Sequence, residues 1–175
     1  MTQAMGDDSP AMQWTDACEP YSSAALELDA AAFAERFDQT YLCFVIGDGK
    51  PDTDLFGTDD EAPAFEPLKL QVLPLVKSAE PGPFTLMITF GRAPSSDLQV
   101  PFSDVSKLHG YFSRDGEGWA VTDAGSTNGT FLDGSRLKPR TPVPLEIGAA
   151  IGIAALEARV LDGRALHAFL QPQLT

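Results

Sequence analysis

The feature that most constrains this fold is a series of short apolar segments, separated by turn signals, that begins at residue 67. Segments such as "LKLQVLPLV", "FTLMITF" and "GWAVTDA" have the length of strands. Turn residues interrupt them at the roughly 8–12-residue spacing of an all-β domain. Asp133-Gly134 and Asp162-Gly163 are typical of β-hairpin turns. The pattern predicts an all-β sandwich of two antiparallel sheets over residues 67–172.

The predicted strands continue to the C-terminal end of this region. The last three expected strands are "VPLEIG", "AAIGIAALEARVLD" and "ALHAFLQ". His167 falls in the last of them, where we expect no functional role for it.

A short helix–strand extension is predicted over residues 24–47. The sequence "AALELDAAAFAERFD" indicates a helix over residues 24–38, with Asp29 as a candidate N-cap. Phe33 and Phe37 are four residues apart and therefore share one helical face. A strand is expected in "TYLCFVIGDG". One helix and one strand cannot form a core of their own, so the extension is predicted to pack on the sandwich.

The remaining segments lack any apolar period. Residues 1–23 are predicted to be a flexible acidic N-terminus. Residues 48–66, which are rich in proline, glycine and aspartate, are predicted to be an acidic linker or loop.

The net charge of −13 excludes one class of partner. It lies entirely in residues 1–66, where 15 acidic residues face only Arg36 and Lys50. Nucleic-acid binding needs clustered basic residues, so nucleic acid is not an expected partner. No apolar run approaches the roughly 20 residues of a membrane helix, so no membrane partner is expected. The acidic N-terminus and the spacing of Cys18 and Cys43 suggest a cytoplasmic protein with free thiols.

Three motifs in fixed order carry the candidate chemistry: Gly91-Arg92, "SKLH" at 106–109 and "GSTNGT" at 125–130. They place an arginine, a lysine, hydroxyls and an amide between predicted strands. A guanidinium matches phosphate oxygens with a planar fork of donors. Hydroxyl and amide groups can bind phosphate oxygens and a peptide backbone.

Each motif has an ordinary explanation when it is taken alone. A single Gly-Arg is typical of a surface arginine, and Lys107 could equally be a solvated lysine. Asn128-Gly129 is also the strongest short-range signal for a hairpin turn. The role of Asn128 in a turn and a role in peptide binding can coexist.

Together the motifs and the strands around them make residues 68–170 resemble a forkhead-associated (FHA) domain. The resemblance implies a β-sandwich whose loops at one end bind phosphothreonine peptides. On this basis Arg92, Ser106 and Lys107 are expected at the phosphate. The resemblance assigns Thr127 to the phosphothreonine residue and Asn128 to the peptide backbone.

Three further residues are expected to support the site: Gly91, His109 and Gly129. The resemblance implies that His109 ties the loops together through its ring nitrogens. A histidine near a serine could instead suggest a hydrolase, but the sequence contains no Gly-x-Ser-x-Gly elbow, P-loop or metal-ligand cluster. We therefore expect no enzyme activity, no metal and no cofactor.

The sequence thus predicts a phosphothreonine-dependent adaptor in Ser/Thr kinase signalling, a function found in bacteria with eukaryote-like kinases. Its expected partner is a threonine-phosphorylated protein, either a Ser/Thr kinase or a substrate of one. Two alternatives stay open. The chain could be a phosphate-independent scaffold, or it could recognise its own phosphorylated threonine, with Thr53 and Thr58 as candidate phosphoacceptors.

Overall fold

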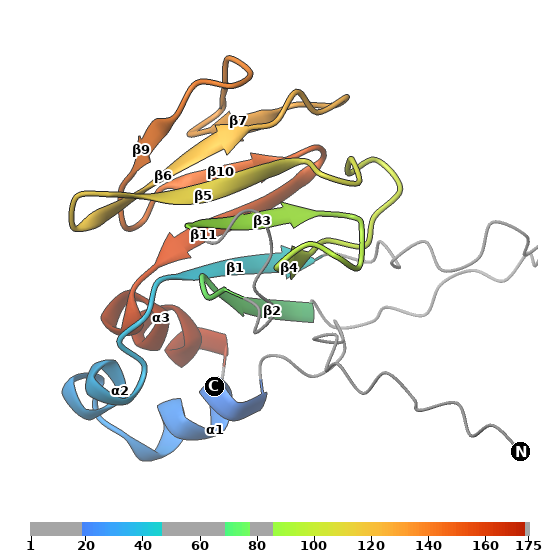
Figure 1. The fold of residues 1–175 in the computed structure, drawn as a ribbon. Helices are drawn as coiled ribbons and strands as arrows, with labels where there is room; N and C mark the ends of the chain where they lie inside the picture. The colour runs from blue at the N-terminus through green and yellow to red at the C-terminus, as the bar shows by residue number, and fades with distance from the viewer. Residues whose placement is uncertain (1–18, 47–68, 78–85, 174–175) are drawn as a thin grey trace, which may run out of the picture.

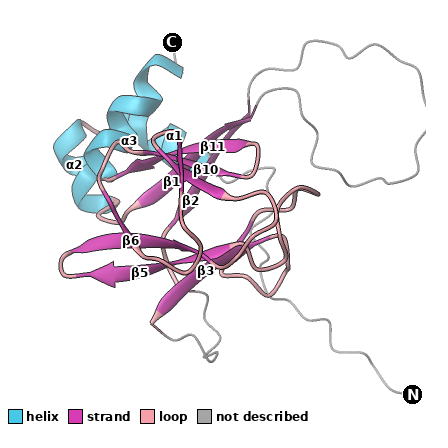
Figure 2. Ribbon diagram, turned by 90° about the horizontal axis from the view of Figure 1, so that it is seen from above, coloured by secondary structure: helices cyan, strands magenta, loops and turns pink. Residues whose placement is uncertain are grey.

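Residues 19–46, 69–77 and 86–173 are described by the computed structural model, and their strands form two sheets packed face to face. Figure 1 shows helices along the outer side of one sheet, and Figure 2 shows them gathered on one side of the strands. The described part of the chain thus has three layers. The predicted all-β sandwich with an N-terminal helix–strand extension is confirmed.

The larger sheet has six strands in the order β2-β1-β11-β10-β7-β8. Neighbouring strands in this sheet are antiparallel. Strand β1, from the predicted extension, lies between β2 and β11 and so belongs to the interior of the sheet. The strands are β1 (Tyr41–Ile46), β2 (Lys69–Pro74), β7 (Thr130–Leu132), β8 (Ser135–Arg136), β10 (Ala150–Ile153) and β11 (Leu156–Leu161).

The smaller sheet has five strands in the order β4-β3-β5-β6-β9. Its pairs are antiparallel except for a two-residue parallel contact between β3 and β4. The strands are β3 (Met87–Gly91), β4 (Leu98–Gln99), β5 (Gly110–Asp115), β6 (Gly118–Asp123) and β9 (Val143–Leu145).

The main core lies between the two sheets. It contains large side chains with no exposed surface, among them Phe44, Phe90, Phe112, Ile151 and Ile153. These residues come from both sheets, and they alternate with more exposed positions in strands such as β5 and β10. The period-2 pattern therefore produces the sandwich, because each strand turns one face inward.

A second core joins the helices to the outer face of the six-stranded sheet. The helices are α1 (Glu19–Glu27), α2 (Ala30–Arg36) and α3 (Gly163–Leu170), followed by a 3-10 turn, η1 (Gln171–Gln173). Phe33 of α2 and Leu166 and Leu170 of α3 pack with Tyr41 and Cys43 of β1. The extension is therefore part of the folded body.

The structure divides the single helix predicted over residues 24–38. Helix α1 begins at Glu19, inside the segment expected to be flexible, and ends at Glu27. The carboxylate of Asp29 then accepts hydrogen bonds from the N–H groups of Ala31 and Ala32, and α2 starts there. The predicted N-cap is confirmed, but a cap begins a new helix, so α1 could not continue through it.

The prediction of a terminal strand at "ALHAFLQ" is wrong, because this segment is helix α3. The Asp162 carboxylate accepts a hydrogen bond from the N–H of Ala165, which makes Asp162 an N-cap rather than part of a hairpin turn. Leu166 and Leu170 are four residues apart and both are fully buried. His167 lies in α3, where its Nε2 is 3.0 Å from the carbonyl oxygen of Leu28.

The segment "AAIGIAALEARVLD" is a hairpin and not the single strand predicted. Strands β10 and β11 pair in antiparallel register on either side of Ala154-Ala155. Ala154 has a φ of 54°, a conformation that alanine rarely adopts, so the sequence carries no turn signal at this point. At Asp133-Gly134 the predicted hairpin turn is confirmed, because it joins the paired strands β7 and β8 with φ of 48° and 81°.

Candidate functional site

Three loops meet at one end of the sandwich. They connect β3 to β4, β4 to β5, and β6 to β7. Strands β3 and β6 end there, and β5 and β7 begin there, because their antiparallel pairing alternates the direction of the chain. The three sequence motifs lie in these loops, so the fold brings together residues that are far apart in the sequence.

Arg92 is the first residue after β3 and is exposed. Its backbone N–H donates to the carbonyl of Ser106 at 2.9 Å, and its Nε donates to the carbonyl of Val105 at 3.1 Å. These bonds hold the base of the guanidinium against the β4–β5 loop. The two terminal nitrogens make no hydrogen bond within the described residues, so they can face a ligand.

Gly91 allows the close approach of these two loops. A Cβ at this position would overlap the carbonyl oxygen of Lys107, which is backbone and cannot move aside. The carbonyl of Lys107 also accepts the N–H of Ala93 at 3.1 Å. The Lys107 side chain is exposed, and its ammonium group makes no ion pair within the described residues.

Ser106 joins the β4–β5 loop to the β6–β7 loop. Its hydroxyl oxygen accepts the backbone N–H of Thr127 at 3.1 Å, and its own N–H donates to Nδ1 of His109 at 3.2 Å. Since the hydroxyl accepts from Thr127, its proton remains available to a ligand oxygen. Thr127 itself is exposed beside it.

His109 is fully buried beneath these loops. Nδ1 accepts from Ser106, so the ring proton lies on Nε2, which is 3.0 Å from the carbonyl oxygen of Gly129 and donates to it. Burial lowers the pKa of His109 below its ordinary 6.5, although the bond to Gly129 and nearby carboxylates oppose the shift. Both nitrogens are occupied, so His109 cannot act as the base of a hydrolase.

Asn128 bridges two loops at the surface. Its amide Nδ2 donates to the carbonyl of Asp104 at 2.6 Å, which leaves its Oδ1 and one N–H to meet a peptide. Gly129 has a φ of 88°, which favours glycine. The Asn-Gly pair does not form a hairpin turn here, because β6 and β7 lie in different sheets.

The sequence reasoning missed Asp123, which shapes the β6–β7 loop. Its buried carboxylate accepts hydrogen bonds from the N–H groups of Gly125 and Ser126 and from the hydroxyls of Ser126 and Thr130. Burial alone would raise the pKa of Asp123, but these hydrogen bonds outweigh burial and lower it below 3.8. An aspartate two residues before Gly125-Ser126 is an Asx-turn signal that could have revealed this role.

Asp97 is a second residue that the motifs did not reveal. Its carboxylate is 2.8 Å from Nζ of Lys77 and also accepts from the N–H and hydroxyl of Thr89. These bonds secure the β3–β4 loop that follows Arg92. No sequence motif links Lys77 to Asp97, because only the fold places them together.

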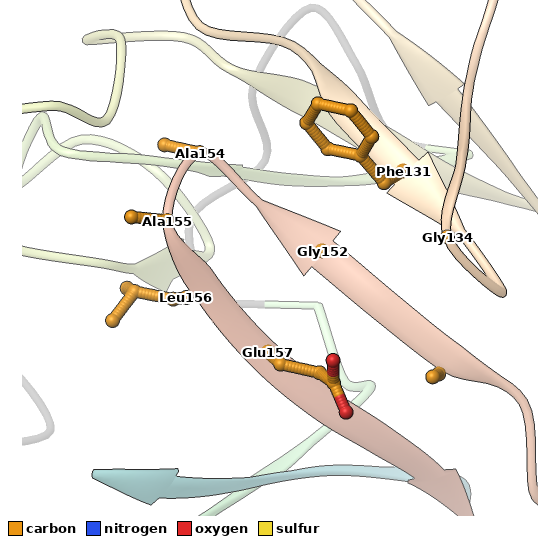
Figure 3. Close-up of a pocket in the computed structure, with 8 residues that line it drawn as sticks. Phe131, Gly134, Gly152, Ala154, Ala155, Leu156 and Glu157 are labelled. Atoms are coloured by element: carbon orange, nitrogen blue, oxygen red, sulfur yellow. The ribbon is translucent and has the colours of Figure 1, made fainter. Parts of the chain in front are cut away.

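A shallow apolar groove of about 290 Å³ lies on the outer face of the six-stranded sheet (Figure 3). The predicted site residues do not line it. Its lining comes from the β7–β8 and β10–β11 hairpins: Phe131, Gly134, Ala150, Gly152, Ala154, Ala155, Leu156 and Glu157.

Other site types find no support in the described ranges. Within residues 19–46, 69–77 and 86–173 no three histidine, cysteine, aspartate or glutamate side chains are grouped to hold a metal. No helix in those ranges is long and apolar enough to cross a membrane. Thr53 and Thr58, the candidate phosphoacceptors, lie outside the described residues.

Comparison with known proteins identifies the region that holds the site. Residues 88–154 match the family model of the FHA domain. The FHA domain-containing protein FhaB of Mycobacterium tuberculosis is 38% identical over 72 residues, which are 41% of this chain and 46% of that protein. The oxoglutarate dehydrogenase inhibitor of Corynebacterium jeikeium is 34% identical over 73 residues, 42% of this chain and 49% of that protein.

This chain thus aligns with a little under half the length of those curated relatives. Among solved structures, Mycobacterium tuberculosis EmbR in complex with a low-affinity phosphopeptide has a TM-score of 0.47 and 19% identity. That match covers 71% of this chain and 24% of that one. The family match spans all three loops and the strands that carry them, and this chain therefore contains an FHA domain.

Proposed function

We propose that this chain is a phosphothreonine-dependent adaptor in Ser/Thr kinase signalling. The observation that carries the proposal is the convergence of Arg92, Ser106, Lys107, Thr127 and Asn128 on one end of the sandwich. Its partner is a threonine-phosphorylated protein, either a Ser/Thr kinase or the substrate of one. The site binds and has no catalytic role.

The free donors of this site suit a phosphate group. Arg92 offers its two terminal nitrogens, Ser106 its hydroxyl proton and Lys107 its ammonium group. A hydrogen bond to a charged group contributes about 1.5–3 kcal/mol. Three or four such bonds, less the free energy of ordering a peptide, predict a Kd of about 1 μM.

The direct test is retention of a phosphothreonine-oriented peptide library by the wild-type chain and by Arg92→Ala. We expect the wild type to retain the phosphothreonine library and to reject phosphoserine and unphosphorylated libraries. Arg92→Ala should lose at least tenfold in affinity, because about 1.5 kcal/mol or more of charged hydrogen bonding is removed.

Arg164→Ala is the matched control for the loss of an arginine. Arg164 is exposed on α3, which follows the end of β11 that lies far from the loops. The Arg164→Ala variant should therefore bind the phosphothreonine library like the wild type. Equal retention of all libraries by the wild type would show that the loops are not a phosphate site and would favour the phosphate-independent scaffold.

A second candidate function is recognition of the chain's own phosphorylated threonine. Ile46 ends β1 and pairs with Lys69, which begins β2. Both lie at the end of the sheet where β11 starts, beside the β10–β11 turn that contacts Gly129. The sequence between them contains Thr53 and Thr58, and the two described residues that flank this sequence lie on the side of the candidate site.

Phosphorylation of the chain by a Ser/Thr kinase tests self-recognition. Tethering raises effective concentration, so phosphorylated protein should bind an external phosphothreonine peptide more weakly than unphosphorylated protein. The double variant Thr53→Ala/Thr58→Ala should restore that binding. Unchanged peptide affinity and unchanged molecular size after stoichiometric phosphorylation would rule out this second function.

A further inference from the structure

Arg136 is a cation at the edge of the candidate site that belongs to none of the three motifs. It is the last residue of β8 and pairs across the strand with Phe131. A Cβ built on Gly129 would lie 2.7 Å from Nε and 3.1 Å from Cζ of Arg136. The guanidinium therefore covers the bare Cα of Gly129, the residue that follows Asn128.

The guanidinium of Arg136 is exposed and lacks a counter-charge within the described residues. Two other cations in the same ranges are engaged. The ammonium of Lys77 is 2.8 Å from the Asp97 carboxylate, and the guanidinium of Arg114 lies over Trp119 at 4.0 Å from the ring centre. Arg136 therefore presents an unused planar fork of donors, the group that pairs with a carboxylate.

The backbone beneath Arg136 is held from two directions. The carbonyl of Gly129 lies 3.0 Å from Nε2 of His109 and accepts the N–H of Ala154 at 3.1 Å. A side chain at residue 129 would push the guanidinium away, so the glycine also makes room for it. Arg136 is consequently positioned beside the β6–β7 loop before any ligand arrives.

We propose that Arg136 is a specificity-determining residue that binds an acidic side chain of the phosphothreonine ligand. This inference rests on the proposed function and names its substrate class. Arg92 and Thr127 both donate backbone hydrogen bonds to Ser106, whereas Arg136 lies beside Gly129. The preferred ligand is a phosphothreonine peptide with aspartate or glutamate in the stretch that passes over Gly129.

A glutamate scan tests this subsite. Phosphothreonine peptides with an otherwise neutral sequence carry a single glutamate, placed in turn at each position on either side of the phosphothreonine. For the wild-type chain, glutamate at one position or two neighbouring positions should tighten binding about two- to fivefold, the range of an exposed ion pair. Arg136→Gln should remove that gain and keep phosphothreonine dependence.

Charge reversal and a control variant complete the experiment. Arg136→Glu should prefer lysine to glutamate at the same position, and the exposed Arg164→Gln should keep the wild-type preference. Thermal unfolding establishes that each variant is folded. An identical glutamate preference in wild type and Arg136→Gln overturns the inference, as does an equal loss of affinity for every peptide. A wild-type chain that ignores the phosphate overturns the proposed function as well.

Discussion

At the scale of single residues, His109 shows how a buried polar group can be structural and still titrate. Its two ring nitrogens link the backbone of Ser106 to that of Gly129, and thus two of the loops. Only the neutral ring can make both bonds, because a protonated Nδ1 is a donor and cannot accept from the Ser106 N–H. The geometry of the site therefore depends on the protonation state of one side chain.

This dependence predicts a loss of stability in mild acid. The folded pKa of His109 lies below 6.5, so below pH 6.5 the unfolded chain binds a proton that the folded chain does not. The free energy of unfolding should fall, by up to about 1.4 kcal/mol per pH unit, as the pH drops from 6.5 to the folded pKa. Chemical denaturation at a series of pH values measures this slope.

His109→Gln supplies the control, since glutamine does not titrate. This variant should be less stable at neutral pH but should lose little further stability as the pH falls below 6.5. Below pH 3.8 the free energy of unfolding of both proteins should fall. The pKa of Asp123 is lower in the folded state than in the unfolded chain, so protons bind preferentially to the unfolded chain there. The same slope in both proteins just below pH 6.5 would contradict the role given to His109.

At the scale of elements, the packing of α3 against α2 depends on one close backbone contact. A Cβ at Gly163, the first residue of α3, would overlap the backbone carbonyl oxygen of Phe37 and lie 3.0 Å from the Cα of Ala34. Both atoms belong to backbone at the end of α2, and neither can rotate away. Glycine at this position therefore lets α2 and α3 pack over the outer face of the sheet.

Gly163→Ala should destabilise the protein by about 1–3 kcal/mol, the usual cost of overpacking. The better helix propensity of alanine, worth up to about 1 kcal/mol, offsets only part of this cost. Gly118→Ala is the matched control. A Cβ added there would lie 3.6 Å from the carbonyl oxygen of Asp115, which is an ordinary van der Waals contact. Urea denaturation of both variants should separate them, and equal stabilities would show that α2 and α3 do not pack this closely.

At the scale of the whole molecule, charge and shape are divided along the chain. The acidic excess lies in residues 1–66, whereas residues 67–175 have no net charge and supply the cations at the loop end. The six-stranded sheet packs against the other sheet on one face and against the helices on the opposite face. The proposed phosphate site therefore lies in the part of the chain that has no net charge, although the net charge of the whole chain is −13.

Sequence alone determined most of the strands, because period-2 burial and turn residues are local signals that each segment carries for itself. It did not reveal the turn between β10 and β11, because Ala154 is not a turn residue. It also determined the order of the three motifs and the N-cap at Asp29. Only the tertiary structure decided that the three motifs converge, that Lys77 pairs with Asp97 and that Arg136 lies over Gly129. Each of these contacts joins segments that are distant along the chain. The same reason explains the error at residues 163–170, where burial against β1 and α2 favours a helix and the short apolar pattern alone fits either structure.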